Sequence, residues 1–327
     1  MKKLINTPSE TLKDFLSGFA AAYARVVVVD QAARFVRRAE VRRDKVAVIS
    51  GGGSGHEPLH VGFVGAGMLD AACPGQIFTS PTPDQILAAH AAVAGDRGAL
   101  FLVKNYEGDQ MNFDMAIEML DTPVAKVVID DDAGGAVSAR SIGRRGVAGT
   151  FVVEKIVGAA AETGLDLEGC RAIAERTVAR TRSMGVALSS CTVPLAGRPT
   201  FSLADNEMEI GVGIHGEPGR ARMPLGTSRS VAELLVEATL RALDAPAGAD
   251  VLLFVNGFGG SPPMELYCLY GDARAALESR GCRVVRSLVG TYVTSLEMAG
   301  ASVTVTLLDD ELARYWDAPA LTPAFVR

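Results

Sequence analysis

Hydrophobic residues recur along this chain in the two spacings typical of strands and of helices. Short apolar runs that end at glycine or polar residues predict buried strands, and apolar residues three or four apart predict amphipathic helices. In the first half, the predicted helices are 9–23 (capped by Ser9), a segment through Ala89 and Ala92, 111–120 and 149–163, and the predicted strands are 25–29, 45–49, 99–103 and 124–129. Three successive strand–loop–helix units favour a largely parallel sheet covered by helices.

The same alternation restarts after a charged helix predicted at 167–182. The predicted strands that follow are 186–191, 251–255, 283–288 and 302–307, and the predicted helices are 231–243 and 264–280. We therefore predict an α/β fold with two domains, each a largely parallel or mixed sheet flanked by helices. The predicted domains are 1–182 and 183–327, a division that the length of 327 residues favours without requiring it.

Composition excludes several classes of function. The net charge is −6, and no cluster of Lys and Arg is interleaved with aromatic residues, so we expect no nucleic-acid partner. No apolar run approaches the roughly 18 residues of a membrane span, and the first residues have no apolar signal region. Five scattered cysteines without paired spacing are typical of a reducing compartment, so we expect a cytoplasmic protein with no membrane contact.

The most unusual stretch is Gly51-Gly52-Gly53-Ser54-Gly55-His56-Glu57-Pro58, predicted to be a bare loop that follows a strand. Such a loop brings main-chain N–H groups close to a ligand. The dinucleotide fingerprint, the P-loop and the nucleophile elbow all fail here, because His56 stands where a glycine is required or no lysine follows. His56 and His60 have the spacing of a zinc-protease motif, but Pro58 between them disfavours the helix which that motif needs. We therefore predict no metal.

Two histidines are the leading candidates for chemistry. His56 and His215 each lie in a glycine-rich segment that ends in Glu-Pro, where a scaffold can present a catalytic group. An imidazole there can equally well serve only to satisfy carbonyl groups of its own loop.

Lys104 and Asp109 follow a predicted strand at the edge of the sheet, and ordinary solvated turn residues would also fit those positions. Three consecutive acids, Asp130 to Asp132, indicate a solvated turn rather than a cation site. His60 and His90 are expected to be structural.

Several longer segments resemble one known family, the dihydroxyacetone-binding subunits of dihydroxyacetone kinases. The matching segments are 51–58, Cys73-Pro74-Gly75 with 77–83, Lys104-Asn105-Tyr106 with Gly108-Asp109, 204–209 through His215-Gly216-Glu217-Pro218-Gly219, and Tyr315-Trp316-Asp317-Ala318-Pro319. The resemblance covers nearly the whole chain, although 220–249 is shorter than the family pattern leads us to expect.

The resemblance implies a role for each matching residue. His215 would add through a ring nitrogen to the ketone carbon of dihydroxyacetone and form a hemiaminal, which glycerol cannot do because it has no carbonyl. Asp109 would be the base that takes a proton from the terminal hydroxyl, and His56 would assist as acid or base. The implied substrate-binding residues are Gly53, Ser54, Gly55, His56, Ser80, Lys104 and Asp109.

The resemblance also implies a partner. No cofactor is expected in this chain, and ADP or ATP with Mg²⁺ would be carried by a separate nucleotide-binding kinase subunit, charged directly or through a phosphotransferase-system phosphocarrier. A homodimer is expected as well. Two alternatives stay open: a kinase subunit for a related short ketose such as erythrulose, and a covalent dihydroxyacetone sensor that acts as a transcriptional coactivator. A sensor needs only His215, so the presence of His56 and Asp109 favours the enzyme.

Overall fold

The computed structural model describes residues 2–134, 143–217 and 219–327, so Gly135 and Pro218 lie outside the described residues. The chain forms two compact units. The first comprises Met1–Ile129, Val152–Arg176 and Arg314–Arg327, and the second comprises Asp130–Phe151 and Thr177–Ala313. The chain passes back and forth between the units, so no single boundary separates them. A cut after Arg182 places 130–151 with the first unit and 314–327 with the second, whereas these segments pack in the opposite units.

The first unit is built on a six-stranded sheet with the order β1-β2-β4-β3-β5-β6. Its strands are β1 (Val27–Asp30), β2 (Phe35–Arg38), β3 (Ala47–Ser54), β4 (Ala71–Ile77), β5 (Ala99–Lys104) and β6 (Val124–Ile129). Strands β4, β3, β5 and β6 run parallel, whereas β1 and β2 add an antiparallel edge. The expectation of a largely parallel or mixed sheet is therefore confirmed for this unit.

Side chains alternate across this sheet and separate its two faces. Ala47 and Ile49 of β3 and Phe101 and Val103 of β5 pack in one hydrophobic cluster with α2 (Pro83–Val93) and α3 (Glu107–Glu118). The intervening positions point to the opposite face, where Ser50 of β3 meets Glu154 of α4 (Gly149–Glu162). Ser50 and Glu154 thus meet on the face of the sheet opposite to this hydrophobic cluster.

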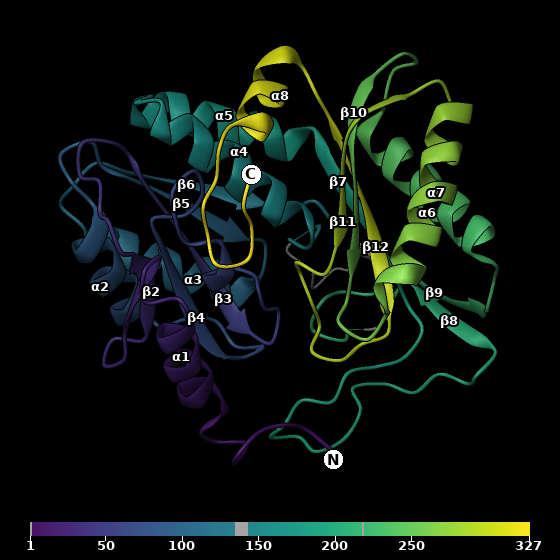
Figure 1. The fold of residues 1–327 in the computed structure, drawn as a ribbon, viewed down its shortest axis with the longest axis horizontal. Helices are drawn as coiled ribbons and strands as arrows, with labels where there is room; N and C mark the ends of the chain where they lie inside the picture. The colour runs from purple at the N-terminus through teal and green to yellow at the C-terminus, as the bar shows by residue number, and fades with distance from the viewer. Residues whose placement is uncertain (1, 135–142, 218) are drawn as a thin grey trace. The chain divides into compact units, whose positions relative to one another are not determined.

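The second unit is built on a six-stranded sheet with the order β11-β10-β12-β7-β8-β9. Its strands are β7 (Thr181–Ala187), β8 (Glu207–Ile210), β9 (Ala221–Pro224), β10 (Asp250–Gly257), β11 (Arg283–Gly290) and β12 (Gly300–Leu307). Among these six strands, β10 and β11 pair in parallel and the other neighbours pair antiparallel. Helices α6 (Ser228–Leu243) and α7 (Pro263–Ser279) lie side by side along the sheet (Figure 1) and bury Leu235 and Leu277 in its core.

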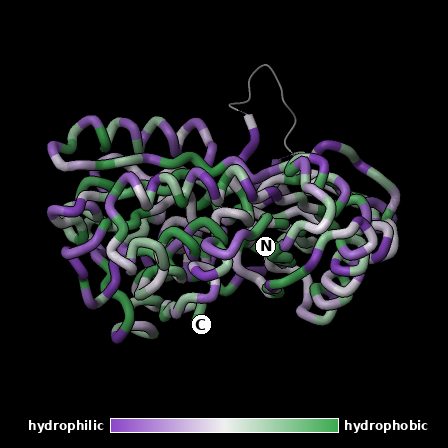
Figure 2. The backbone as a smooth tube through the Cα atoms, turned by 90° about the horizontal axis from the view of Figure 1, so that it is seen from above, coloured by the Kyte–Doolittle hydropathy of each residue, from purple (hydrophilic) through white to green (hydrophobic). Residues whose placement is uncertain are grey.

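The remaining helices are α1 (Thr11–Ala22), η1 (Val61–Phe63, a short 3₁₀ helix), α5 (Leu167–Ala179) and α8 (Asp310–Asp317). Hydrophilic and hydrophobic residues alternate along the outer helices (Figure 2), as the amphipathic pattern predicts. No helix in the described part of the chain is both long and apolar enough to cross a membrane. In the same part, no three His, Cys, Asp or Glu side chains gather as metal ligands.

Several predicted bounds were wrong. Residues 51–54 form the end of β3, not a loop, because they pair with β4 on one side and partly with β5 on the other. Helix α5 ends at Ala179, and the strand predicted at 186–191 is β7, which begins at Thr181. No side chain caps α1, which Ser9 was expected to do. Strands β2, β4, β8 and β9 and helix α8 were not predicted.

Candidate functional site

The glycine-rich stretch is bare because other groups occupy the space that its side chains would fill. A Cβ atom on Gly52 would stand 2.0 Å from Lys104 Nζ, and one on Gly53 would stand 2.6 Å from the backbone nitrogen of Thr79. Real Cβ contacts this short do not occur, so position 53 requires glycine because backbone atoms stand in the way, whereas a side chain at position 52 would displace the end of the Lys104 side chain. The consequence is a strand end against which the Lys104 ammonium and the turn at Phe78 and Thr79 lie directly.

His56 follows this strand end and is fully buried. Its ring stacks on Phe78, with the ring centroids 4.9 Å apart and the planes 14° from parallel. Ser54 Oγ donates a hydrogen bond to the Gly75 carbonyl at 2.7 Å, which ties the end of β3 to β4. The amide of Gly55 donates to Glu57 Oε2 at 2.9 Å, and burial raises the pKa of Glu57 to about 7. The imidazole therefore packs on Phe78, while hydrogen bonds of the neighbouring Ser54 and Gly55 fix the backbone that leads to it.

Lys104 and Asp109 form a buried ion pair, with Lys104 Nζ 3.6 Å from Asp109 Oδ2. The helix that was predicted to begin at Met111 begins at Glu107, so Asp109 lies in its first turn rather than in a loop. A helix N-terminus favours a negative charge there. Ser80 lies against the same turn, since a Cβ atom on Gly108 would stand 2.8 Å from Ser80 Oγ. The structure thus brings these predicted residues together around the start of α3.

A second set of polar side chains lies directly beyond Lys104. Lys104 Nζ is 2.9 Å from His60 Nε2, and His60 Nδ1 is 2.5 Å from Glu154 Oε1 and 3.0 Å from Ser50 Oγ. All four side chains are buried. Burial raises the pKa of Glu154 to about 8, although Ser50 and the Lys104 charge oppose this, and burial lowers the pKa of His60. His60, expected to be structural, is in contact with a predicted substrate-binding residue.

The raised pKa of Glu154 predicts a pH dependence of stability. The folded carboxyl keeps its proton up to about pH 8, whereas the unfolded one loses it near 4.5. The folded state therefore binds the extra proton between these values, and its stability falls as pH rises through this window. Glu154→Gln should reduce that fall by up to about 1.4 kcal/mol per pH unit, measured by urea unfolding at several pH values.

Glu162→Gln is the matched control on the same helix. Burial alone would raise the pKa of Glu162, but its hydrogen bond with Arg38 and the charges of Lys45 and Arg38 lower it below 4.5. Above that value Glu162 is ionised in both the folded and the unfolded state, so it adds no pH dependence to stability there. The slope of stability against pH for Glu162→Gln between about pH 5 and about pH 8 should therefore match the wild-type slope. Equal slopes for Glu154→Gln and the wild type would contradict the prediction.

His215 lies in the second unit, and the carboxylate of Glu217 holds it by two contacts. Its backbone N–H donates to Glu217 Oε2 at 3.0 Å, and its ring Nδ1 is 2.9 Å from Glu217 Oε1. Burial alone would raise the pKa of Glu217, but the hydrogen bond and charge of His215 and the charge of Arg145 lower it to about 2. Glu217 is thus a carboxylate that accepts the Nδ1 proton, and in the neutral form of the ring Nε2 then keeps its lone pair.

Arg145 supports this arrangement from the segment before α4. Its guanidinium donates to Asp132 Oδ2 at 2.7 Å and to the Gly211 carbonyl at 2.8 Å. Burial raises the pKa of Asp132 to about 6, although the Arg145 charge opposes this. A Cβ atom on Gly213 would lie 2.2 Å from Glu217 Oε2 and 2.7 Å from an Arg145 nitrogen, so this glycine also makes room for the charged groups. The expected solvated turn at Asp130 to Asp132 was wrong, because Asp131 and Asp132 are buried.

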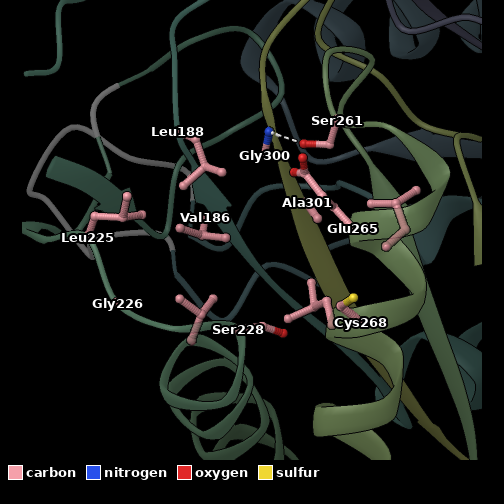
Figure 3. A pocket seen from close by; sticks show the side chains of 13 residues that line it. Val186, Leu188, Leu225, Gly226, Ser228, Ser261, Glu265, Cys268, Gly300 and Ala301 are labelled. Atoms are coloured by element: carbon pink, nitrogen blue, oxygen red, sulfur yellow. Dashed lines mark hydrogen bonds between the residues drawn. The ribbon is translucent and has the colours of Figure 1, made fainter. Parts of the chain in front are cut away.

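An apolar pocket in the second unit holds none of the predicted site residues (Figure 3). It is lined by Val186, Leu188, Leu225, Gly226, Ser228, Val231, Ser261, Glu265, Leu266, Cys268, Leu269, Gly300 and Ala301. At the edge of this pocket, the Gly300 amide donates a hydrogen bond to Ser261 Oγ at 2.8 Å. Apart from Glu265 and Cys268, its lining offers hydrophobic contact and small polar groups rather than acid–base groups.

Three residues near the predicted groups were missed by sequence reasoning: Ser50, Glu154 and Glu217. Glu154 carried a signal, because it stands beside Lys155 inside the apolar run Phe151-Val152-Val153 and Ile156-Val157, where charges are rare unless paired. Glu217 was quoted within a motif but was given no role. Nothing in the sequence pairs Ser50 with His60, since this contact depends on the packing of the sheet.

Comparison with known proteins identifies the family. The model of the Dak1 domain matches residues 17–324. The chain is 46% identical to the dihydroxyacetone-binding subunit DhaK of a PTS-dependent dihydroxyacetone kinase of Listeria innocua, over 95% of each chain. It is 45% identical to the corresponding subunit of the PEP-dependent kinase of Escherichia coli, over 99% of each. It is also 41% identical to a D-erythrulose kinase of Mycolicibacterium smegmatis, of which it covers 56%.

Solved structures support the same assignment. A dihydroxyacetone kinase operon co-activator, DhaQ, superimposes with a TM-score of 0.90 and 32% identity, covering 96% of this chain and 98% of that one. The dihydroxyacetone kinase of C. freundii superimposes with a TM-score of 0.87 and 35% identity, covering 99% of this chain and 60% of that one. The chain therefore belongs to the Dak1 domain family, in which it resembles the DhaK subunits of dihydroxyacetone kinases over nearly its whole length.

Proposed function

We propose that this chain is the substrate-binding subunit of a dihydroxyacetone kinase, a phosphotransferase that acts on an alcohol group. The observation that carries the proposal is His215, whose Nδ1 faces the Glu217 carboxylate at 2.9 Å and whose Nε2 is thereby the nucleophilic nitrogen. The identity to DhaK subunits at nearly full length supports the substrate class.

The chemistry begins at His215. The Nε2 lone pair adds to the ketone carbon of dihydroxyacetone, the carbonyl π electrons move to oxygen, and that oxygen takes a proton from solvent, which gives a hemiaminal on a cationic ring. The ring gains positive charge as the bond forms, and the Glu217 carboxylate stabilises this charge through Nδ1–H. Glycerol has the hydroxyls but no carbonyl, so the covalent step selects the ketose.

The first unit supplies the groups for phosphoryl transfer. Asp109 is the base for the terminal hydroxyl, Lys104 holds substrate oxygens beside it, and His56 donates or accepts a proton. The backbone of Gly53, Ser54 and Gly55 and the Ser80 hydroxyl complete the contacts to the substrate. Phosphoryl transfer depends mainly on positioning and charge neutralisation, so a base and a cation suffice from this subunit.

The phosphoryl group comes from a separate subunit that carries ADP or ATP with Mg²⁺. The failed nucleotide motifs of this chain support that division of labour, and so do the PTS-dependent and PEP-dependent kinases named among its relatives, which favour a phosphocarrier as the ultimate donor. We further propose that the chain forms a homodimer. We also propose that it is cytoplasmic, which the free state of all five cysteines supports because thiols persist in a reducing compartment.

The test is carbon NMR of dihydroxyacetone labelled at its carbonyl carbon and added to the protein alone. We expect the ketone signal to convert to a tetrahedral carbon signal, and His215→Ala to abolish this conversion. His90→Gln is the matched control, because His90 is a buried histidine that contacts only Thr122 Oγ1 and Phe101 among the interactions described. A tetrahedral signal that persists in His215→Ala would remove His215 as the nucleophile.

The likeness to the DhaQ co-activator favours a second candidate, a covalent sensor that performs no catalysis. Adding a nucleotide-binding kinase subunit and a phosphoryl donor separates the two. Formation of dihydroxyacetone phosphate supports the kinase, whereas covalent capture without phosphorylation supports the sensor. Erythrulose tested in the same assay decides between the two short ketoses, a choice that the likeness to the D-erythrulose kinase raises.

A further inference from the structure

A chain of buried polar side chains continues from Lys104 through His60 to Glu154, and none of these contacts belongs to the covalent step. It joins β5 to α4 through a histidine on the segment after β3. The successive distances are 2.9 Å from Lys104 Nζ to His60 Nε2 and 2.5 Å from His60 Nδ1 to Glu154 Oε1. Lys104 and Glu154 are fully buried and His60 is 4% exposed, so no bulk water competes for these bonds.

The chain permits one arrangement of protons. A lysine ammonium can only donate, so His60 Nε2 must carry its lone pair toward Lys104. The neutral ring then has its proton on Nδ1, which donates to Glu154 Oε1. Ser50 agrees with this, because its hydroxyl donates to the Leu102 carbonyl at 2.8 Å and leaves Oγ as an acceptor 3.0 Å from Nδ1. Burial and the neighbouring Lys104 charge, which lower the pKa of His60, keep the ring neutral.

The Lys104 ammonium is held from several directions. It donates to the Gly51 carbonyl at 3.3 Å and to His60 Nε2, and it lies 3.6 Å from Asp109 Oδ2. Gly52 lies against it on another side, since a Cβ atom there would stand 2.0 Å from Nζ. The bond to His60 is the shortest of these contacts, and it requires the tautomer that Glu154 imposes.

We propose that Glu154 and His60 are positioning residues for Lys104, and that together they fix its ammonium beside Asp109 in the orientation that binds the hydroxyl oxygens of a short ketose. The ketose part of this proposal rests on the proposed function. Loss of the acceptor at 154 leaves the Nδ1 proton with the longer contact to Ser50 Oγ, so the tautomer with its proton on Nε2 gains population, and that proton points one N–H at another. The ammonium then turns away from His60, and the ketose loses a fixed donor.

The first arm of the test uses the protein without ligand. Long-range proton–nitrogen NMR distinguishes the two tautomers of a neutral histidine, and the chain has four histidines, so His60→Phe assigns the His60 signals by their disappearance. We expect the proton on Nδ1 in the wild type and in Glu154→Gln, whose amide oxygen still accepts, and a mixture of tautomers in Glu154→Leu. A wild-type ring with its proton on Nε2 would overturn the proposal whatever the protein binds.

The second arm measures dihydroxyacetone affinity by the carbon NMR titration. We expect the dissociation constant to rise about tenfold in Glu154→Leu and to stay within about twofold in Glu154→Gln. His60→Phe keeps a ring of similar size without its nitrogens and should give the same tenfold loss, so the test survives if the leucine variant does not fold. Unchanged affinity in both disruptive variants would overturn the proposal. Failure of the wild type to capture dihydroxyacetone would instead remove the proposed function, and the nitrogen signals would still decide the tautomer.

Discussion

Asp109→Asn should lower the turnover of a reconstituted kinase by about 10²–10⁴-fold while leaving covalent capture of dihydroxyacetone intact. The amide cannot take the proton of the terminal hydroxyl, but it keeps the size of the carboxylate at the first turn of α3. Capture depends on His215 and should persist. The measurement combines steady-state phosphorylation with the carbon NMR signal of the adduct on the same preparation.

Asp114→Asn provides the matched control, because Asp114 is a half-buried aspartate on the same helix and pairs with Lys126 at 2.5 Å. Its turnover should stay within about twofold of the wild type, since a partly exposed ion pair contributes little. Near-normal turnover in Asp109→Asn would exclude Asp109 as the base. Loss of the adduct in that variant would assign Asp109 to binding instead of proton transfer.

Glu217→Leu should weaken covalent capture by about 100-fold. The leucine leaves His215 Nδ1 without its acceptor at 2.9 Å and removes the negative charge that stabilises the ring once it bears the substrate. Glu217→Gln retains an acceptor but not the charge, so its loss should be intermediate. The measurement is the dissociation constant of labelled dihydroxyacetone, from the intensity of the tetrahedral carbon signal.

Glu207→Leu controls for the removal of a carboxylate from the same unit, since Glu207 lies on β8 and reaches Arg222 at 3.8 Å. We expect its adduct affinity to equal that of the wild type. Equal affinity in Glu217→Leu would mean that His215 needs no acceptor at Nδ1, and the orienting role of Glu217 would have to be abandoned.

The local hydrophobic pattern was sufficient to predict those helices and strands that depend mainly on residues close together in the sequence. Strand β10 and helix α6 were each found with three residues missing at their ends, because a continuous apolar run and a long apolar stripe leave few alternatives. The candidates His56, Lys104, Asp109 and His215 were also found from the sequence, because they lie in long motifs that resemble a known family. Their assigned roles stay predictions.

Tertiary structure decided what depends on partners distant in the chain. Gly51 to Gly53 look like a loop by composition, yet they form a strand because β4 supplies the hydrogen-bonded partner along their length. Strand β4 was not predicted, because Pro74 lies within it and proline disfavours a strand interior. In the structure, Pro74 lies beyond the part of β4 that pairs with β2, so it removes no hydrogen bond from that pair.

The contact of His60 with Glu154 joins residues 94 positions apart, and that with Lys104 joins residues 44 apart. The sequence determined that these polar residues exist within apolar surroundings. Only the fold brought them within hydrogen-bond distance, because burial makes each of them dependent on the others for a partner.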